Sequence, residues 1–447
     1  MIHALPASLL LLVHLTATAC GILVIRKYRW DWPVPAAMLG GLALVGLTAF
    51  SFAAGDPPPG HLFADFRIAY YLAGQAVLQH NDALRALVDR GVFGFVNLPI
   101  VAYLFAPLGM LPLHLAMVLF TGIGLGLAAT AWWLLVRLAD LHGRERWLLL
   151  FLFAMNGPLL YSVKEGNTSH WILFALALAL ALLQSGRRFA AGVVMGVATV
   201  LKLPLALFGL YFALRRDWRA TLGLAGVCAT TVALSVIVFG WDFVVHWYDV
   251  CVRQFSSQWL AAFNVQSLQS FMLRWDIAPE RLLDWTAAPP TPVRSIALYI
   301  AVVLVYCSAM WSGFLASFRA IGPARTTLEF LLVVALALLT SPISWSHYYA
   351  WLLLPAAFFL GSRSPFADAP AARVIGWAAI LLTTPLVRSL DFTDPTFMAV
   401  YVDFGASYLL FGGVLWFGLI AWSLATPTLR KPYLQVPAAA QGDESTA

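Results

Sequence analysis

The sequence predicts an all-α polytopic membrane protein, and three observations lead to that prediction. The mean hydropathy of the 447 residues is +0.82, with 61% of them hydrophobic and only 11% charged. Apolar runs near the roughly 20 residues that a transmembrane helix needs recur along almost the whole chain. Basic residues gather between alternate runs, which is typical of the cytoplasmic loops of membrane proteins.

Eleven full spans are predicted from the apolar runs. In chain order they cover about residues 6–25, 34–54, 114–136, 147–162, 169–185, 220–240, 296–318, 327–341, 348–361, 374–388 and 404–425. The first run has no basic segment before it and no clear cleavage site, so we interpret it as a retained span rather than a signal peptide.

The basic residues predict the orientation of these spans. If the spans alternate in direction, 17 of the 27 Lys and Arg residues fall on one side and nine on the other. The richer side is therefore expected to be cytoplasmic, with the N-terminus outside and the C-terminus inside. The same bias accounts for the net charge of +6, and no basic patch on a soluble fold indicates a nucleic-acid partner.

Residues 189–214 do not fit this alternation, because basic clusters flank the segment at both ends. Its middle reads Leu201-Lys202-Leu203-Pro204, where a proline disrupts a helix interior and a lysine at membrane depth is costly. We expect a broken, re-entrant pair of half-helices with Lys202 at the tip, pointing into a cavity. The alternative is one ordinary span. Lys202 would meet either a bound anion or a buried carboxylate.

The predicted topology places the unusual polar residues at membrane boundaries on the outer face. Two carboxylates are Asp65, which starts the first outer loop, and Glu165, in Glu165-Gly166-Asn167. The others are Asn167, Asn264 and Gln266 in Asn264-Val-Gln-Ser-Leu268, and His347 and Tyr348 in Ser344-Trp-Ser-His-Tyr348. A chain this apolar retains few polar groups at the membrane edge, so their gathering predicts one site at the outer surface.

Residues 66–90 show helical spacing of apolar positions and are expected to form an amphipathic helix in the headgroup layer. A carboxylate at its start is favoured by the helix dipole, so Asp65 is either a functional carboxylate or a helix cap. His347 has an equally simple alternative as an interfacial histidine, and Glu165 as the surface partner of Lys164.

The cysteines and acidic residues indicate no metal site. Of the four cysteines, only Cys251 lies in a predicted loop, and no pair has the spacing of metal ligands or of a disulfide framework. No acidic cluster has the spacing of Mg²⁺ or Mn²⁺ ligands, so metal independence is expected.

Six motifs follow one another between about residues 60 and 360. They are Asp65-Phe-Arg-Ile-Ala-Tyr-Tyr, the run from Asn97 to Pro112, Glu165-Gly-Asn167, the run from Ala191 to Pro204, Asn264-Val-Gln-Ser-Leu268 and Ser341-Pro-Ile-Ser-Trp-Ser-His347. In their order and spacing they resemble glycosyltransferase family 87, the polyprenyl-phosphate-mannose-using α-mannosyltransferases of the GT-C superfamily.

The resemblance implies roles for three residues at matching positions. Asp65 corresponds to an outer-loop aspartate that acts as general base, His347 to a histidine beside the donor phosphate, and Lys202 to the lysine of the broken helix. Arg67 is a further candidate for the donor phosphate, and Glu165, Asn167, Asn264, Gln266 and Tyr348 are candidates for substrate binding.

The implied reaction is transfer of a hexose, mannose for this family, from a polyprenyl-phosphate donor to a glycolipid or polysaccharide acceptor. One base without a paired acid favours direct displacement with inversion. No cofactor is expected besides the lipid-linked donor, and membrane lipid is the remaining partner. The alternatives are a secondary transporter, because broken helices with polar tips are typical of transporters, and a lipid-sugar flippase.

The resemblance also gives an expected division of the chain. Residues 1–55 would form N-terminal spans, 56–360 the catalytic core of GT-C type, 361–430 C-terminal spans and 431–447 a disordered cytoplasmic tail. The protein is expected in the cell membrane, inner or plasma, with its active site on the extracytoplasmic face.

Overall fold

A computed structural model describes residues 7–28, 35, 38, 62–79, 81–257, 259–275, 277–315 and 322–426 of the chain. Regular structure in these ranges is helical, apart from two isolated bridges that pair Trp259 with Ala288 and Val265 with Trp345. The predicted span at 34–54, except residues 35 and 38, and the predicted tail at 431–447 lie outside the described residues.

Six stretches of helix in the described part are long and apolar enough to cross a membrane. They are α1 (Ala7–Lys27), α6 (Leu113–Leu138), α12 (Trp218–Phe239), α16 (Pro292–Met310) with its π-helical extension to Gly313, α17 (Pro323–Thr340), and α20 (Pro395–Asp403) with α21 (Tyr408–Ala425). This confirms the predicted all-α polytopic membrane protein.

One bent pair of helices in the described part is long and apolar enough to cross only if its two halves are taken as a single span. It consists of α7 (Arg144–Met155) and α8 (Gly157–Glu165), which meet at an angle of 47°. Asn156 stands at the break, where its side chain accepts from Leu159 N at 2.8 Å and donates to Thr383 O at 3.1 Å. Pro158 begins the second helix, so the bend has a proline and a capping asparagine as its causes.

The remaining predicted spans are shorter helices. They are α9 (Ser169–Gln184), α18 (Leu353–Leu360), which follows a 3₁₀ segment at Ser346–Leu352, and α19 (Pro370–Thr383). The number of eleven full spans therefore stays a prediction.

The helices differ greatly in how much protein surrounds them. In α17, 72% of the apolar stretch is buried inside the protein, whereas the values for α12 and α16 are 17% and 11%. A helix that is apolar on all sides yet unburied in the protein is suited to lipid contact. We therefore place α17 at the core of the membrane domain and α12 and α16 at its lipid-facing edge.

The re-entrant pair is present as predicted. It consists of α10 (Arg188–Leu201), a 3₁₀ turn at Leu203–Ala206 and α11 (Leu207–Leu214), with Lys202 in an extended conformation at the break. Arg188 at the start of α10 and Asp217 just after α11 form an ion pair at 2.7 Å. The chain therefore leaves this segment on the side where it entered.

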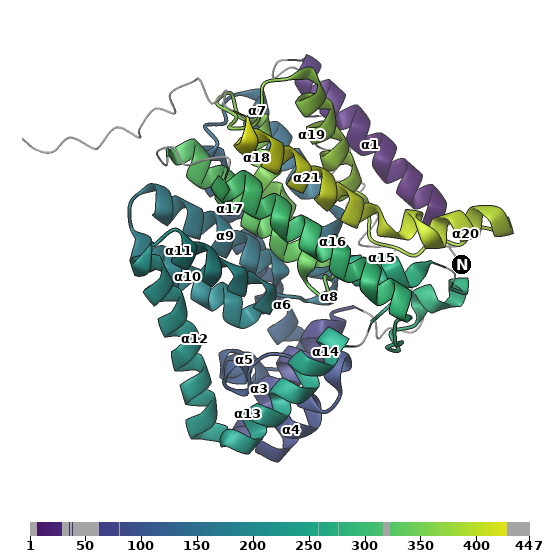
Figure 1. The fold of residues 1–447 in the computed structure, drawn as a ribbon. Coiled ribbons are helices and arrows are strands. Elements are labelled where there is room, and N and C mark those ends of the chain that lie inside the picture. Colours follow the sequence, from purple (N-terminus) through teal and green to yellow (C-terminus); the bar gives the residue numbers. More distant parts are fainter. Residues whose placement is uncertain are drawn as a thin grey trace, which may run out of the picture.

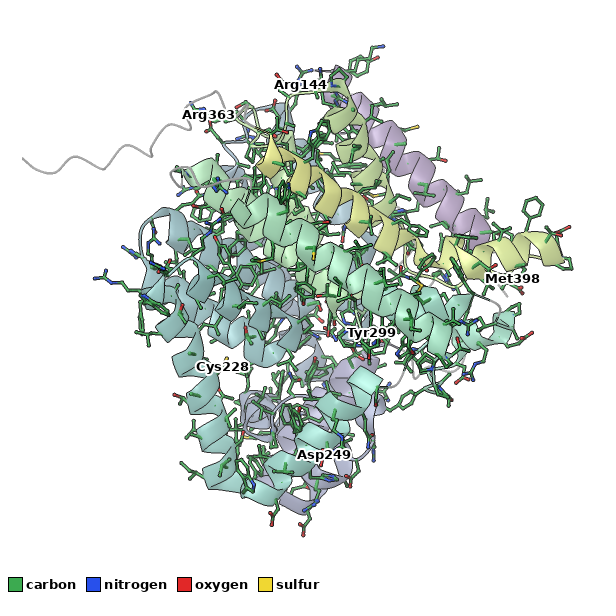
Figure 2. All side chains as sticks on the ribbon, viewed as in Figure 1. Arg144, Cys228, Asp249, Tyr299, Arg363 and Met398 are labelled. Atoms are coloured by element: carbon green, nitrogen blue, oxygen red, sulfur yellow. The ribbon has the colours of Figure 1, made fainter. Side chains whose placement is uncertain are left out.

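The basic clusters of the sequence also come together in space. Arg144 donates to Arg26 O at 2.7 Å, and Arg363 lies 3.4 Å from Asp140. Figure 2 shows Arg144 and Arg363 at one end of the molecule and Asp249, in a predicted outer segment, at the opposite end.

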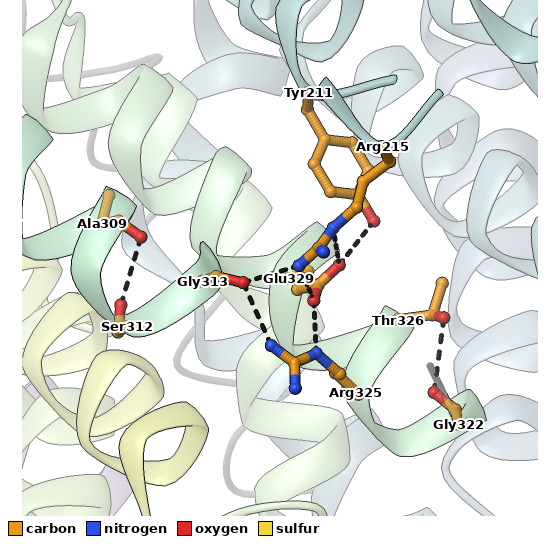
Figure 3. A network of polar contacts seen from close by, with 9 residues as sticks. All are labelled: Tyr211, Arg215, Ala309, Ser312, Gly313, Gly322, Arg325, Thr326 and Glu329. Carbon is orange, nitrogen blue, oxygen red and sulfur yellow. Dashed lines mark hydrogen bonds and ion pairs between the residues drawn. The ribbon is translucent and has the colours of Figure 1, made fainter. Parts of the chain in front are cut away.

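A second cluster on this side surrounds Glu329. Its carboxylate accepts from Arg325 Nε at 2.7 Å, from Arg215 Nε at 3.0 Å and from Tyr211 at 3.2 Å, and both arginines also donate to Gly313 O (Figure 3). These residues lie in or directly after α11, in α17 and in the π-helical extension of α16. The cluster therefore joins three membrane elements.

Short helices between the spans form the opposite end of the molecule. Those between α1 and α6 are a π-helix at Phe66–Tyr71, α3 (Leu72–Gln79), α4 (Asn81–Val88) and α5 (Ala102–Gly109). Those between α12 and α16 are α13 (Trp241–Tyr248), a π-helix at Asp249–Arg253, α14 (Gln254–Ser257), α15 (Leu268–Arg274) and a 3₁₀ segment at Pro279–Leu283.

The helix predicted over residues 66–90 is thus divided into three helical segments. It is also packed more closely than a helix lying in headgroups alone. A Cβ at Gly74 would stand 2.4 Å from Phe105 O, and α3, α4, α5, α13 and α14 gather at the lower end of Figure 1. This end carries Asp65 at the start of its first segment.

Candidate active site

A cavity of about 1520 Å³ lies where the re-entrant pair meets the short helices around Asp65. Seven of the nine residues predicted from the sequence line it: Asp65, Glu165, Asn167, Lys202, Asn264, His347 and Tyr348. They come from segments that are far apart in the chain, so the fold brings together most of the predicted set.

Asp65 immediately precedes the π-helix at Phe66–Tyr71, and its side chain makes no capping hydrogen bond to that helix. The carboxylate instead accepts from Asn167 Nδ2 at 2.5 Å. Asp65 therefore lines the cavity and does not cap its helix, while its role as a functional carboxylate stays a prediction. Single π-turns occur often at functional sites.

The turn at Gly166 places Asn167 beside Asp65. Gly166 ends α8 in the left-handed conformation, with φ of 66°, and a Cβ there would stand 2.5 Å from the Cβ of Phe66. Phe63 N also donates to Lys164 O at 2.8 Å, which joins the two loops directly. Glycine therefore provides both the positive φ and the close approach that Asn167 needs.

Asn167 bridges the carboxylate to the lysine of the broken helix. Its Oδ1 accepts from Lys202 Nζ at 2.9 Å and from Ser169 N at 3.1 Å, while its Nδ2 donates to Asp65. The amide orientation follows from this set of partners. Among the residues that the structure describes, Lys202 forms no direct ion pair with a carboxylate, and its ammonium group lines the same cavity as Asp65.

Lys202 also lies over an aromatic ring. Its Nζ is 4.7 Å from the ring centroid of Tyr348, which in turn stacks on Trp351 at 4.9 Å. Asn97 Nδ2 donates to Leu201 O at 3.0 Å and to Val200 O at 3.3 Å, which satisfies carbonyls at the interrupted end of α10. These contacts hold the ammonium group at the break.

His347 is 4% exposed, and among the described residues neither of its ring nitrogens has a hydrogen-bond partner. Its ring lies between Tyr161 and Trp345, with both centroids 6.3 Å away. A buried polar group without a partner is costly unless a ligand or water supplies one. Because His347 lines the cavity, a bound substrate can supply it.

Glu165 and Asn264 form the adjoining wall. Lys164 Nζ lies 2.9 Å from Glu165 Oε1, as the pairing alternative for Glu165 anticipated, yet both residues line the cavity. Asn264 Nδ2 donates to the hydroxyl of Tyr161 at 3.2 Å, and its Oδ1 accepts from Trp285 Nε1 at 3.0 Å.

The other two predicted residues, Arg67 and Gln266, do not line the cavity. Arg67 is not among the lining residues, although it is only two positions from Asp65. Gln266 is buried, and its amide bonds the backbone at Phe263, Ala406 and Leu410, which is a structural arrangement. Their roles in substrate binding stay predictions.

The cavity has lining residues that the sequence did not single out. Among them are Tyr161, Trp285 and Arg388, with Asn97 quoted only within a motif. Each looks like an ordinary aromatic or loop residue in the sequence. Only the folded chain shows that they face the same space as Asp65.

Burial raises the pKa of the Asp65 carboxyl. The hydrogen bond from Asn167 and the positive charges of Lys202 and Lys164 act in the opposite direction, and burial outweighs them. Perturbed pKa values of this kind occur often at functional sites.

Metal coordination finds no support among the described residues, where no three His, Cys, Asp or Glu side chains lie close enough to hold an ion. Metal independence stays a prediction. The chemistry available at the site is a proton acceptor, an ammonium group and an unsatisfied imidazole around a common space.

The described part of the chain thus combines several apolar helices with a buried cavity that holds a carboxylate and an ammonium group. The model of glycosyltransferase family 87 matches residues 95–342, more than half of the chain. The chain belongs to glycosyltransferase family 87 and is a membrane glycosyltransferase. The match contains Asn167 and Lys202 but neither Asp65 nor His347.

Curated relatives agree with the family. The chain is 28% identical over 357 residues to a polyprenol-phosphate-mannose-dependent alpha-(1-2)-phosphatidylinositol pentamannoside mannosyltransferase of Mycolicibacterium smegmatis, covering 76% of this chain and 79% of that protein. An enzyme of the same name from Mycobacterium tuberculosis is 26% identical, over 76% and 75% of the two chains. No solved structure matches the chain significantly.

Proposed function

We propose that the chain transfers mannose from a polyprenyl-phosphate donor to a glycolipid or glycan acceptor at the extracytoplasmic face of the membrane, with inversion at the anomeric carbon. The observation that carries this proposal is the link from Asp65 through Asn167 to Lys202 at the cavity wall. It combines a proton acceptor with a cation, which displacement of a phosphate by a hydroxyl requires.

In this proposal Asp65 is the general base. It takes the proton of the acceptor hydroxyl while that oxygen forms a bond to the anomeric carbon. The bond between that carbon and the donor phosphate oxygen breaks on the opposite side. A donor with a β linkage then gives an α product. The raised pKa of Asp65 suits it to hold the proton after attack.

Lys202 and His347 are assigned to the donor phosphate. The departing polyprenyl phosphate carries the bonding electrons away as negative charge and needs positive or hydrogen-bonding groups rather than a protonated acid. Lys202 Nζ has Asn167 as a neutral partner, so its charge is not cancelled by a direct carboxylate contact. The unpartnered ring nitrogens of His347 provide a second contact.

One side of the cavity suits the hydrocarbon chain of such a donor. We call it the apolar arm, and its residues are Leu203, Leu207, Leu210, Cys228 and Val232. Leu203 and Leu210 are more than half exposed, so the arm opens outward beside the lipid-facing α12. A polyprenyl tail can thus remain in the bilayer while its phosphate reaches Lys202.

The choice of mannose and of a mannosylated glycolipid is supported by the relatives, whose names specify polyprenol-phosphate-mannose as donor and phosphatidylinositol pentamannoside as acceptor. Residues 56–360, with the re-entrant pair and the outer helices, would be the catalytic core, since most of the cavity residues fall within them. The separation of the basic clusters from Asp249 supports an active site away from the cytoplasm (Figure 2).

The test uses purified protein in proteoliposomes with polyprenyl-phosphate mannose and phosphatidylinositol mannosides. We expect the parent protein to form an α-linked product and Asp65→Asn to lose about 10²–10⁴ in rate, the usual cost of losing a general base. Transfer by Asp65→Asn within about threefold of the parent would remove Asp65 from the reaction. Movement of the donor across the bilayer without transfer would indicate the flippase alternative.

A further inference from the structure

A second side of the cavity is lined by segments other than those of the apolar arm. Residues on this side come from the segment at 279–285 and from the segment at 387–391. Figure 2 shows Cys228 of the apolar arm and the lining residue Met398 on opposite sides of the molecule, so the cavity reaches across much of its width. We call this second side the polar arm, defined by Glu280, Trp285, Arg388, Ser389 and Asp391.

The two segments of the polar arm are held together by a hydrophobic cluster. Leu282 of the 3₁₀ segment is fully buried against Met398, Tyr401 and Val402 of α20. The hydroxyl of Tyr401 accepts from Leu390 N at 3.0 Å and donates to Arg388 O at 3.4 Å. The two segments of the polar arm are therefore fixed relative to each other by their shared packing against α20.

Trp285 is the aromatic surface of the arm. Its indole nitrogen donates to Asn264 Oδ1, and its ring meets Phe263 edge to face with centroids 6.4 Å apart. The ring is half-buried and lines the cavity, so its orientation is set while part of its surface stays open. Aromatic rings with one polar partner give large contact areas to ligands that present apolar faces and hydroxyls.

The charged groups of the arm have both signs. Glu280 and Asp391 are exposed, and among the described residues neither carboxylate has a hydrogen-bond or ion-pair partner. Arg388 and Ser389 line the same part of the cavity. Carboxylates and guanidinium groups beside an aromatic ring recognise hydroxyls from several directions, which fits a polyhydroxylated ligand better than a hydrocarbon chain.

We infer that the polar arm is the acceptor subsite and binds the sugar residues of the acceptor that do not react. This inference rests on the proposed function, because it assigns the remaining side of the same cavity to the second substrate. The acceptor would lie along Trp285 with its hydroxyls donating to Glu280 and Asp391, which directs its reacting hydroxyl toward Asp65.

The variants that test the polar arm are Glu280→Gln, Asp391→Asn and Trp285→Ala. The matched control is Asp368→Asn, because Asp368 is also an exposed carboxylate but does not line the cavity. In the proteoliposome assay, we expect the KM for phosphatidylinositol mannoside to rise about tenfold or more for each lost charged hydrogen bond. The KM for the donor should stay within threefold of the parent value in every variant, and so should the KM for the acceptor in the control.

Binding is also measured without turnover, in Asp65→Asn protein that carries each arm variant. The probes are phosphatidylinositol mannoside in detergent micelles and a lipid-free manno-oligosaccharide, which distinguish the glycolipid from its glycan alone. Weaker binding of either probe supports the inference. Unchanged acceptor binding and KM in folded variants would overturn it. A parent that binds the probe but transfers no mannose would instead contradict the proposed function.

Discussion

At the residue scale, Asn167 is central to the site because its side chain bonds both Asp65 and Lys202. It was predicted to bind substrate, yet its amide is occupied by Asp65, Lys202 and Ser169. We therefore regard it as a positioning residue. It orients the carboxylate and keeps the lysine from pairing with it directly.

Asn167→Ala should lower kcat by about tenfold to a hundredfold, the worth of one charged hydrogen bond. It should also move the acid limb of the pH profile. Asp65 must be ionised to act, so activity falls as the pH drops through its pKa, which burial already raises. The bond from Asn167 lowers that pKa, so its loss should shift the limb to higher pH. A fall in kcat without that shift would indicate a merely structural role.

Lys202→Met tests the other end of the bridge. The ammonium group interacts with an amide oxygen and a tyrosine ring, and within the described part of the chain it forms no direct ion pair with a carboxylate. Removing the ammonium group therefore deprives no buried carboxylate of a direct ion-pair partner. We expect Lys202→Met to fold and to bind the donor more weakly. Thermal unfolding and donor titration check this. A folded variant with unchanged donor affinity and rate would exclude Lys202 from the phosphate site.

The sequence located most of these residues because polar groups are rare in so apolar a chain, and each one near a boundary could be considered individually. It could not show that Asn167 bridges Asp65 and Lys202, because Asn167 is 102 residues from Asp65 and 35 residues from Lys202 in the chain. Trp285 and Arg388 were missed for a related reason. A single aromatic or basic residue in a loop carries no signal until the fold places it in the cavity.

At the scale of elements, the junction of α8 and α9 determines where Asn167 stands. The re-entrant pair was predictable from Lys202, Pro204 and the flanking arginines, since each has a local physical reason. The bend between α7 and α8 was not, because the tertiary contact of Asn156 with Thr383 helps to define it.

Gly166→Ala should destabilise the protein although the new methyl group touches no substrate. Positive φ costs a non-glycine residue about 1–3 kcal/mol, and the added Cβ would also meet Phe66 at 2.5 Å. We expect a lower Tm and a loss of transfer, measured on purified protein in detergent.

Gly186→Ala is the matched control for that substitution. Gly186 also has a positive φ, of 76°, but nothing lies within 4 Å of its Cβ position. It should lower Tm through strain alone and leave kcat unchanged. If both variants lost the same amount of stability and activity, the contact between Gly166 and Phe66 would not be what places Asn167.

At the scale of the whole molecule, the ion pairs on one side and the cavity on the other define two ends. Arg188 with Asp217 and Arg363 with Asp140 form ion pairs at one end. The cluster around Glu329 joins three membrane elements (Figure 3). The bias of basic residues predicts that this end is cytoplasmic. A donor that presents its sugar at the outer surface then reaches Asp65 without crossing the membrane.

Cysteine labelling in intact cells tests this orientation. In a variant with the four native cysteines replaced, Thr286→Cys beside the polar arm should react with a membrane-impermeant maleimide before lysis. Ser362→Cys, next to the ion-paired Arg363, should react only after permeabilisation. Both positions are exposed, so a difference in labelling reports the side of the membrane and not burial. The reverse pattern would place Asp65 in the cytoplasm, where the proposed reaction would need its donor sugar on the inner surface of the bilayer.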